Sequence, residues 1–148
     1  MDIKERTSEA LSPSDTPTRN AGAGRIALLA IGDALVFIVF AVIGMRSHKE
    51  GLTIPSVLIT AAPFAIGWFI VSPFIGAFRR NVTSQVGRMS ARTALAWLAA
   101  WPVGLLLRGI TRHEIPPVTF ALITLVTNAI FLQLWRVPFA WVANRRKR

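Results

Sequence analysis

The chain has 148 residues, of which 53% are hydrophobic, and its net charge is +10. It has no cysteine, which excludes disulfides, thiol catalysis and cysteine-ligated metals. A soluble protein this basic would suggest a nucleic-acid partner, but here the basic residues flank long apolar runs, as membrane topology signals do. We therefore expect a single-domain, all-α integral membrane protein with no nucleic-acid partner.

The two ends of the chain are polar and are expected to lie outside the membrane. Residues 1–24 are rich in Ser, Thr, Pro and Gly, a composition that cannot bury a core and predicts a disordered cytoplasmic tail. Residues 144–148 form a second, basic cytoplasmic tail. The transmembrane domain is expected between them, over residues 25–143.

Four apolar runs in this domain match the length that a membrane span requires. A hydrocarbon core of about 30 Å needs about 20 apolar residues in a helix. The predicted spans, which form a four-transmembrane-helix bundle, cover approximately residues 25–45, 56–78, 93–110 and 117–142.

The distribution of basic residues predicts the orientation. Twelve Lys and Arg residues lie in the two tails and in the loop 79–92, and four lie on the other side. Cytoplasmic loops carry this excess, so both termini are expected in the cytoplasm, beside anionic lipid of the membrane. In the loop 79–92, Val82, Val86 and Met89 have helical spacing, which fits a short interfacial helix, although an ordinary basic loop fits as well.

One carboxylate, Asp33, lies inside the first span. It is about 12 Å from the cytoplasmic end, counted from Arg25, and Arg136 in the fourth span is about 10 Å from the same side. An intramembrane charge needs a partner, so the matching depths predict a buried Asp33–Arg136 pair. The alternative is that Arg136 extends alone toward the headgroups.

Further polar and small residues mark faces of the spans. Thr124 and Asn128 lie on one side of the fourth span, where they either make interhelical hydrogen bonds, the favoured interpretation, or line a solute or proton path. The third span has Ala96, Ala100 and Gly104 at i+4 spacing, which predicts close helix packing, within the monomer or between copies. Among the tryptophans, Trp97, Trp135 and Trp141 fit an aromatic belt, and Trp68 and Trp101 fit packing anchors.

The outer loops hold the two histidines and two acids, His48, Glu50, His113 and Glu114. Their spacing is not that of a known metal motif, so no metal is expected. We instead predict an outer polar cluster of His48, Arg108 and Glu114 that connects the first and third spans. No nucleophile–base set or phosphate loop is visible, so we expect neither an enzyme nor a cofactor.

Several short motifs together resemble an uncharacterised prokaryotic membrane family, catalogued as domain of unknown function three thousand and fifty-four. They are Gly32-Asp33-Ala34, Phe40 to Gly44, Arg46-Ser47-His48, Pro63-Phe64 with Gly67-Trp68, Gly104 with Leu107-Arg108, and Trp135-Arg136. The resemblance covers approximately residues 25–140. It implies a small multi-span membrane protein and no particular activity, and it makes Asp33, His48, Arg108 and Arg136 the first residues to test.

Two functions fit these features. The first is a structural or accessory membrane protein that packs with itself or with a larger complex. In this protein the Asp33–Arg136 pair would hold the helices together. The second is a small proton- or solute-coupled transporter in which Asp33 titrates. A permanently paired carboxylate stays ionised, whereas a carrier carboxylate must gain and lose a proton or ligand. We favour the first function, because four helices form only a small bundle and would need to oligomerise to enclose a transport path.

Overall fold

The computed structural model describes residues 16–147, and their side chains from Gly22 onward. This part of the chain forms five helices and no strand: α2 (Thr16–Ser47), α3 (Ile54–Ile75), α4 (Arg80–Thr83), α5 (Val86–Arg112) and α6 (Val118–Arg145). All of them except the short α4 are long and apolar enough to cross a membrane. The expected all-α architecture with four candidate spans is therefore present.

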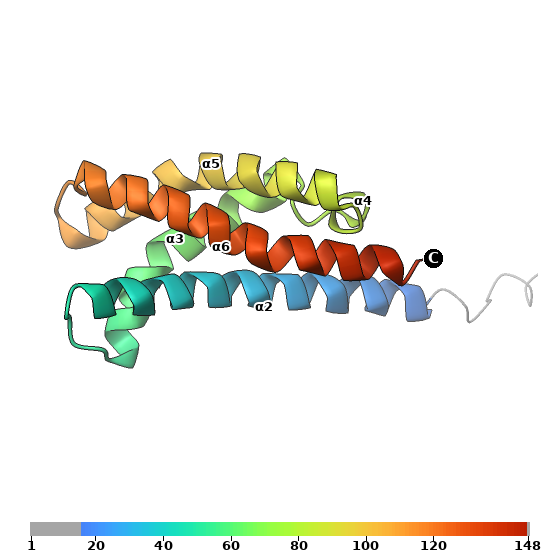
Figure 1. Ribbon diagram of the computed structural model, residues 1–148, viewed down its shortest axis with the longest axis horizontal. Helices are drawn as coiled ribbons and strands as arrows, with labels where there is room; N and C mark the ends of the chain where they lie inside the picture. Colours follow the sequence, from blue (N-terminus) through green and yellow to red (C-terminus); the bar gives the residue numbers. More distant parts are fainter. Residues whose placement is uncertain (1–15, 148) are drawn as a thin grey trace, which may run out of the picture.

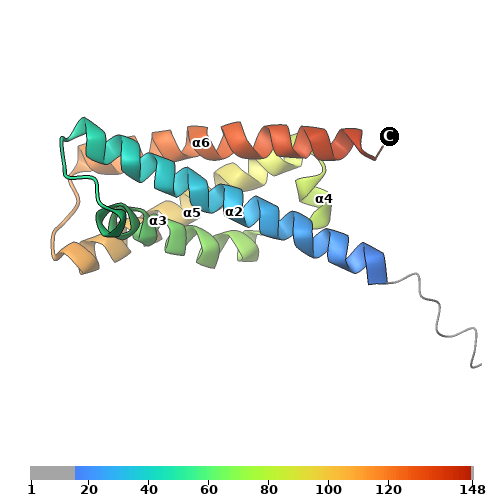
Figure 2. The ribbon, with the colours of Figure 1, turned by 90° about the horizontal axis from the view of Figure 1, so that it is seen from below.

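The four long helices form an elongated bundle in which α2 and α6 cross and α3 packs against α5 (Figures 1 and 2). The start of α2, the end of α6 and the short α4 lie at one end of the bundle, which we call the terminal end. The α2–α3 and α5–α6 connections lie at the other end, the loop end. An even number of spans places both ends of the described chain on the same side, as the sequence predicts.

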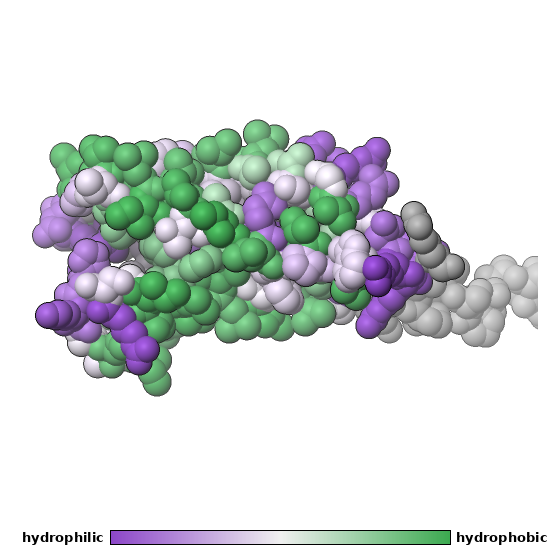
Figure 3. All heavy atoms as spheres, in the orientation of Figure 1, coloured by the Kyte–Doolittle hydropathy of each residue, from purple (hydrophilic) through white to green (hydrophobic). Residues whose placement is uncertain are grey.

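The surface of the bundle has the pattern of a protein that sits in lipid. Apolar side chains cover its middle, and hydrophilic side chains gather at both ends (Figure 3). Ile31, Leu58, Leu98 and Leu122 are each more than half exposed, at 59%, 51%, 57% and 53%. A soluble monomer rarely exposes so much contiguous apolar surface, whereas a bilayer solvates it.

The first helix begins well before the predicted start of the first span. The helix α2 begins at Thr16, so residues 16–24 are helical and do not belong to the predicted disordered tail, of which residues 1–15 lie outside the described part. Extending an existing helix costs little. The extension also packs against the bundle, because a Cβ added to Gly22 would lie 3.0 Å from Nη2 of Arg80 in α4.

The predicted basic loop 79–92 is largely helical, since it contains α4 and the first turns of α5. Val82 and Met89 are buried with Leu29 and Ala140 in a small apolar cluster. The helical part of the first interpretation is confirmed. Its interfacial part is wrong for Val82 and Met89, which turn toward the protein core instead of the lipid.

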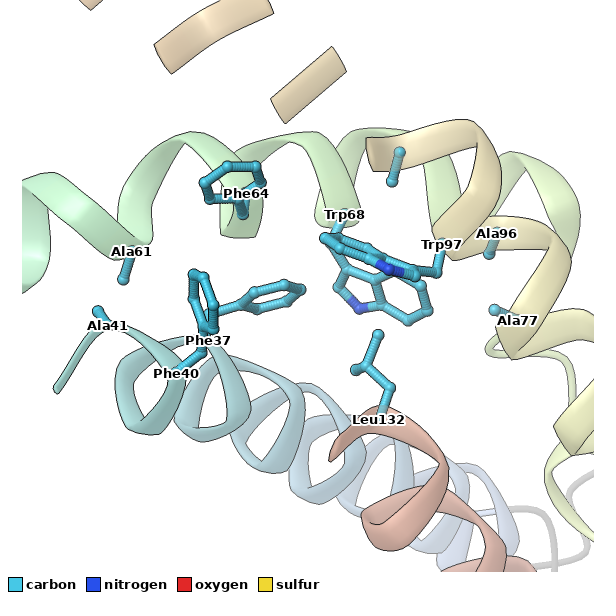
Figure 4. Close-up of a cluster of buried hydrophobic side chains, with 11 residues drawn as sticks. Phe37, Phe40, Ala41, Ala61, Phe64, Trp68, Ala77, Ala96, Trp97 and Leu132 are labelled. Atoms are coloured by element: carbon cyan, nitrogen blue, oxygen red, sulfur yellow. The ribbon is translucent and has the colours of Figure 1, made fainter. Parts of the chain in front are cut away.

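Aromatic side chains fill the centre of the bundle where α2, α3 and α5 meet (Figure 4). The ring of Phe37 lies 6.4 Å from Trp68 and 5.6 Å from Trp97, centroid to centroid, in tilted pairs of the kind that aromatic rings prefer. Trp97 is therefore a core residue, with 1% of its surface exposed, and its assignment to an interfacial belt was wrong.

The helices α3 and α5 make close contact through small residues. Ala96, Ala100 and Gly104 are buried, as the i+4 stripe predicts, and the contact is made within the monomer. A Cβ added to Gly67 of α3 would lie 3.0 Å from the Ala100 carbonyl oxygen. Gly67 thus lets the two backbones approach, and this fixes the position of the next residue, Trp68.

Candidate functional site

The candidate site is an ion pair between Asp33 of α2 and Arg136 of α6. Both side chains have no exposed surface. Nε of Arg136 donates to Oδ1 of Asp33 at 2.9 Å, and Nη2 donates to Oδ2 at 2.5 Å. This bidentate geometry is the strongest form of a carboxylate–guanidinium contact, and it places the two residues together as their matching depths predict.

The other polar atoms of the pair are satisfied by α3 and the turn that follows it. The indole Nε1 of Trp68 donates to Oδ2 of Asp33 at 3.0 Å. Nη1 of Arg136 donates to the Ala77 carbonyl oxygen at 3.0 Å. The pair therefore connects α2, α3, α6 and the segment before α4, so it lies at the junction of most of the bundle.

Aromatic rings complete the surroundings of the guanidinium group. Its central carbon lies 4.9 Å from the centroid of the Trp68 ring and 4.8 Å from that of Phe78. Desolvated cation–π contacts of this kind contribute about 2 kcal/mol. Trp68 thus serves both charges, with its N–H toward the carboxylate and its ring toward the cation.

Burying two charges is costly unless their geometry and their remaining hydrogen bonds compensate for lost water. Here both carboxylate oxygens and all three guanidinium nitrogens have partners. The arrangement therefore favours the charged pair, and removal of either member would leave the other as an uncompensated charge in the core.

Replacement of Trp68 by Phe is expected to lower the free energy of unfolding by about 2 kcal/mol, because a hydrogen bond to a charged group contributes about 1.5–3 kcal/mol. A smaller aromatic ring would remain in the core, and the control below loses the same ring atoms from another buried tryptophan. The measurement is unfolding by SDS titration in mixed micelles. Trp97→Phe is the matched control, because its Nε1 donates to the neutral Leu125 carbonyl and its loss should cost less. Equal costs for the two variants would contradict the special role of Trp68.

Two polar residues of the fourth span form hydrogen bonds within their own helix and not the predicted bonds between helices. Thr124 Oγ1 donates to the Phe120 carbonyl at 2.7 Å, and Asn128 Nδ2 donates to the Thr124 carbonyl at 3.1 Å. Both bonds stay within α6, so these two residues do not form the predicted interhelical bonds. Gln133 does so instead, since its Nε2 donates to the Ser90 carbonyl of α5 at 3.0 Å.

Three polar side-chain atoms in the core have no hydrogen-bond partner among the residues described. They are Ser72 Oγ, Thr93 Oγ1 and Asn128 Oδ1. Their residues are at most 1% exposed. Buried polar atoms are normally paired, so these three are candidates for contact with water or a polar solute.

The outer polar cluster is formed only in part. Arg108 is half-buried, with its guanidinium carbon 4.2 Å from the centroid of Phe120, and the charges of Glu50 and Glu114 act on it from the two outer loops. His48 and Glu114 are exposed, and no salt bridge joins Glu114 to Arg108 within residues 16–147. The same part of the chain holds no group of three or more potential metal ligands.

The hydrogen bond from Trp68 and the Ala77 carbonyl were missed by the sequence analysis. The sequence predicts Trp68 only as a packing anchor. A depth count would have indicated more, because Trp68 lies about 15 Å from the predicted inner end of its span at Phe78, close to the depth of Asp33. No sequence signal identifies a backbone carbonyl such as that of Ala77 as a ligand of the guanidinium group.

The comparisons with known proteins give one match. The model of a family described as "Protein of unknown function (DUF3054)" matches residues 30–139, a segment that contains both members of the ion pair. Neither the curated proteins nor the solved structures contain a match to the chain. Since the family model covers most of the chain, this protein belongs to the DUF3054 family.

Proposed function

We propose that this protein is a structural or accessory component of a prokaryotic plasma membrane. In this role the Asp33–Arg136 pair holds the four spans in one arrangement. The bundle then offers a fixed surface to further copies of itself or to a larger membrane complex. The proposal assigns it no catalytic reaction and no cofactor.

The observation that carries this proposal is that each side-chain nitrogen and oxygen of the buried pair has a hydrogen-bond partner. The Asp33 carboxylate has no exposed surface and accepts three hydrogen bonds, two of them from a guanidinium group. A carrier must release and recover such a partner in every cycle. This geometry supports a role of the pair as a lasting connection between helices.

The proposed orientation places the terminal end in the cytoplasm. Arg145 ends α6, and Arg146 and Lys147 line one groove there with Arg25 of α2. The segment 79–92 at the same end adds further basic residues. The loop end holds fewer basic residues, which are Arg46, Lys49, Arg108 and Arg112. The positive-inside rule then supports cytoplasmic termini, with anionic lipid at that face.

A flux measurement in liposomes tests the proposal. The purified protein is reconstituted with a pH-sensitive dye inside the vesicles, and a proton gradient is imposed. We expect wild type, Asp33→Asn and protein-free vesicles to lose the gradient at the same rate. Native electrophoresis of mild-detergent extracts should show wild type as an oligomer or within a larger complex. The proposal would be contradicted by a proton flux that wild type shows and Asp33→Asn lacks. A wild-type protein that is purely monomeric would contradict it as well.

A second candidate function is a small proton- or solute-coupled transporter that uses Asp33. The unpartnered atoms of Ser72, Thr93 and Asn128 favour it, because they mark polar positions in the core that a water or solute could occupy. The same flux assay separates the two candidates, since only the transporter requires Asp33 for a flux.

A further inference from the structure

A groove opens near the terminal end of the bundle between residues 24–28 of α2 and the last turns of α6. Its volume is about 670 Å³. Its lining includes the apolar side chains Leu28, Phe139 and Val142 and the basic residues Arg25, Arg146 and Lys147. The last two follow the end of α6, so they mark the mouth of the groove. No acidic residue belongs to the described lining. The groove therefore combines an apolar interior with a positive mouth.

A second groove continues the apolar surface toward the middle of the membrane. It has a volume of about 330 Å³, shares Leu134 and Trp135 with the first, and extends along α2 as far as Val39. From Gly24 to Val39 an α-helix rises about 22 Å. One leaflet of the hydrocarbon core is about 15 Å thick, so the two grooves together span the depth of a lipid acyl chain.

The charges at the mouth favour an anion. The carboxyl end of the α6 dipole contributes about half a negative charge, which the three cations outweigh. Arg25 is held in place, since its Nη2 donates to the Thr83 carbonyl and its guanidinium carbon lies 5.6 Å from the Phe139 centroid. The neighbouring Arg145 is engaged elsewhere, over the Trp141 ring at 3.6 Å. Arg146 and Lys147 are exposed and can close on a headgroup.

We propose that this groove binds one anionic phospholipid. The lipid phosphate would lie among Arg25, Arg146 and Lys147, and one acyl chain would lie along α2 and α6. The apolar walls select a lipid over a free anion, and the cations select an anionic over a zwitterionic headgroup. This assignment goes beyond the proposed function and does not depend on it, because a transporter could hold the same lipid.

The test uses the full-length protein, delipidated in mild detergent. Native mass spectrometry and thermal unfolding are followed with dioleoyl-phosphatidylglycerol, with dioleoyl-phosphatidylcholine, which has the same chains, and with inorganic phosphate. We expect one retained phosphatidylglycerol and a larger rise in Tm than with the other two ligands. Each cation removed should weaken its binding about fivefold.

The variant Arg146→Gln/Lys147→Gln removes two exposed cations of the mouth and should bring phosphatidylglycerol binding close to that of phosphatidylcholine. The variant Arg46→Gln/Arg112→Gln removes the same charge from exposed positions at the loop end and should bind like wild type. Equal affinity for the two lipids, an equal shift with inorganic phosphate, or equal losses in the two variants would each overturn the proposal.

Discussion

Replacement of Arg136 by Gln is expected to lower the free energy of unfolding by about 3–5 kcal/mol, the cost of removing one member of a buried ion pair. The side chain of Arg136 has no exposed surface, and its loss leaves the Asp33 carboxylate in the core with only the Trp68 hydrogen bond. It also leaves the Ala77 carbonyl without its donor. Unfolding by SDS titration in mixed micelles measures the change.

A double-mutant cycle separates the pair from the rest of the packing. Asp33→Asn is expected to cost somewhat less than Arg136→Gln, because the amide can still accept a hydrogen bond. The double variant should cost clearly less than the sum of the two single variants. Arg145→Gln, which removes an exposed cation from the same helix, serves as the control and should change stability by less than about 1 kcal/mol. Additive or negligible costs at Asp33 and Arg136 would show that the pair does not hold the bundle together.

The predicted loss of stability at Arg136 is larger than the loss usually measured for polar contacts in membrane proteins. A typical interhelical hydrogen bond there contributes only about 0.6 kcal/mol, because the separated helices find other partners. A fully buried carboxylate and guanidinium have no comparable alternative in lipid, since charge in the hydrocarbon core is costly. The pair should therefore contribute far more than the bond between Gln133 and the Ser90 carbonyl.

Much of the architecture could be predicted because the membrane imposes it. A run such as residues 26–45 is as long and apolar as a span must be, and it is observed within α2. The position of the charged pair followed as well. The spans run antiparallel, so depth can be counted from either end, and a lone carboxylate in lipid needs a partner at its own depth.

What could not be predicted is the direction in which side chains point once several helices meet. One of the two interpretations of the segment 79–92 placed Val82 and Met89 against lipid, yet both are buried in the protein. In a membrane protein, an apolar side chain suits both environments equally, so hydrophobicity alone does not separate them. For the same reason Trp97 was assigned to the interface, although it lies in the aromatic core and donates to the Leu125 carbonyl.

The same ambiguity does not affect glycine. Because it has no side chain, glycine at a helix crossing lets two backbones approach closely. The residue Gly67 lies where α3 meets α5, and a Cβ there would be 3.0 Å from the Ala100 carbonyl oxygen and 3.1 Å from the Gly104 nitrogen. Both neighbours are backbone atoms, so no rotamer change can relieve the contact. A larger residue must separate the two helices.

Replacement of Gly67 by Leu is therefore expected to lower the free energy of unfolding by more than about 3 kcal/mol, at or above the upper end of the usual cost of overpacking a core. Gly67→Ala should cost about 1–3 kcal/mol. Thermal unfolding and SDS titration measure both effects. Gly44→Leu is the control: no atom outside its immediate backbone lies within 4 Å of an added Cβ, so this variant should be neutral or slightly stabilising.

The position of Gly67 beside Trp68 gives this prediction a second readout. If α3 moves away from α5, the indole of Trp68 can no longer keep its 3.0 Å bond to Asp33, and the energetic coupling between Asp33 and Arg136 should weaken. The double-mutant cycle repeated in the Gly67→Ala background would measure that change. An unchanged coupling would mean that the α3–α5 contact and the ion pair stabilise the bundle independently. A reduced coupling would show that this backbone contact positions the charged site.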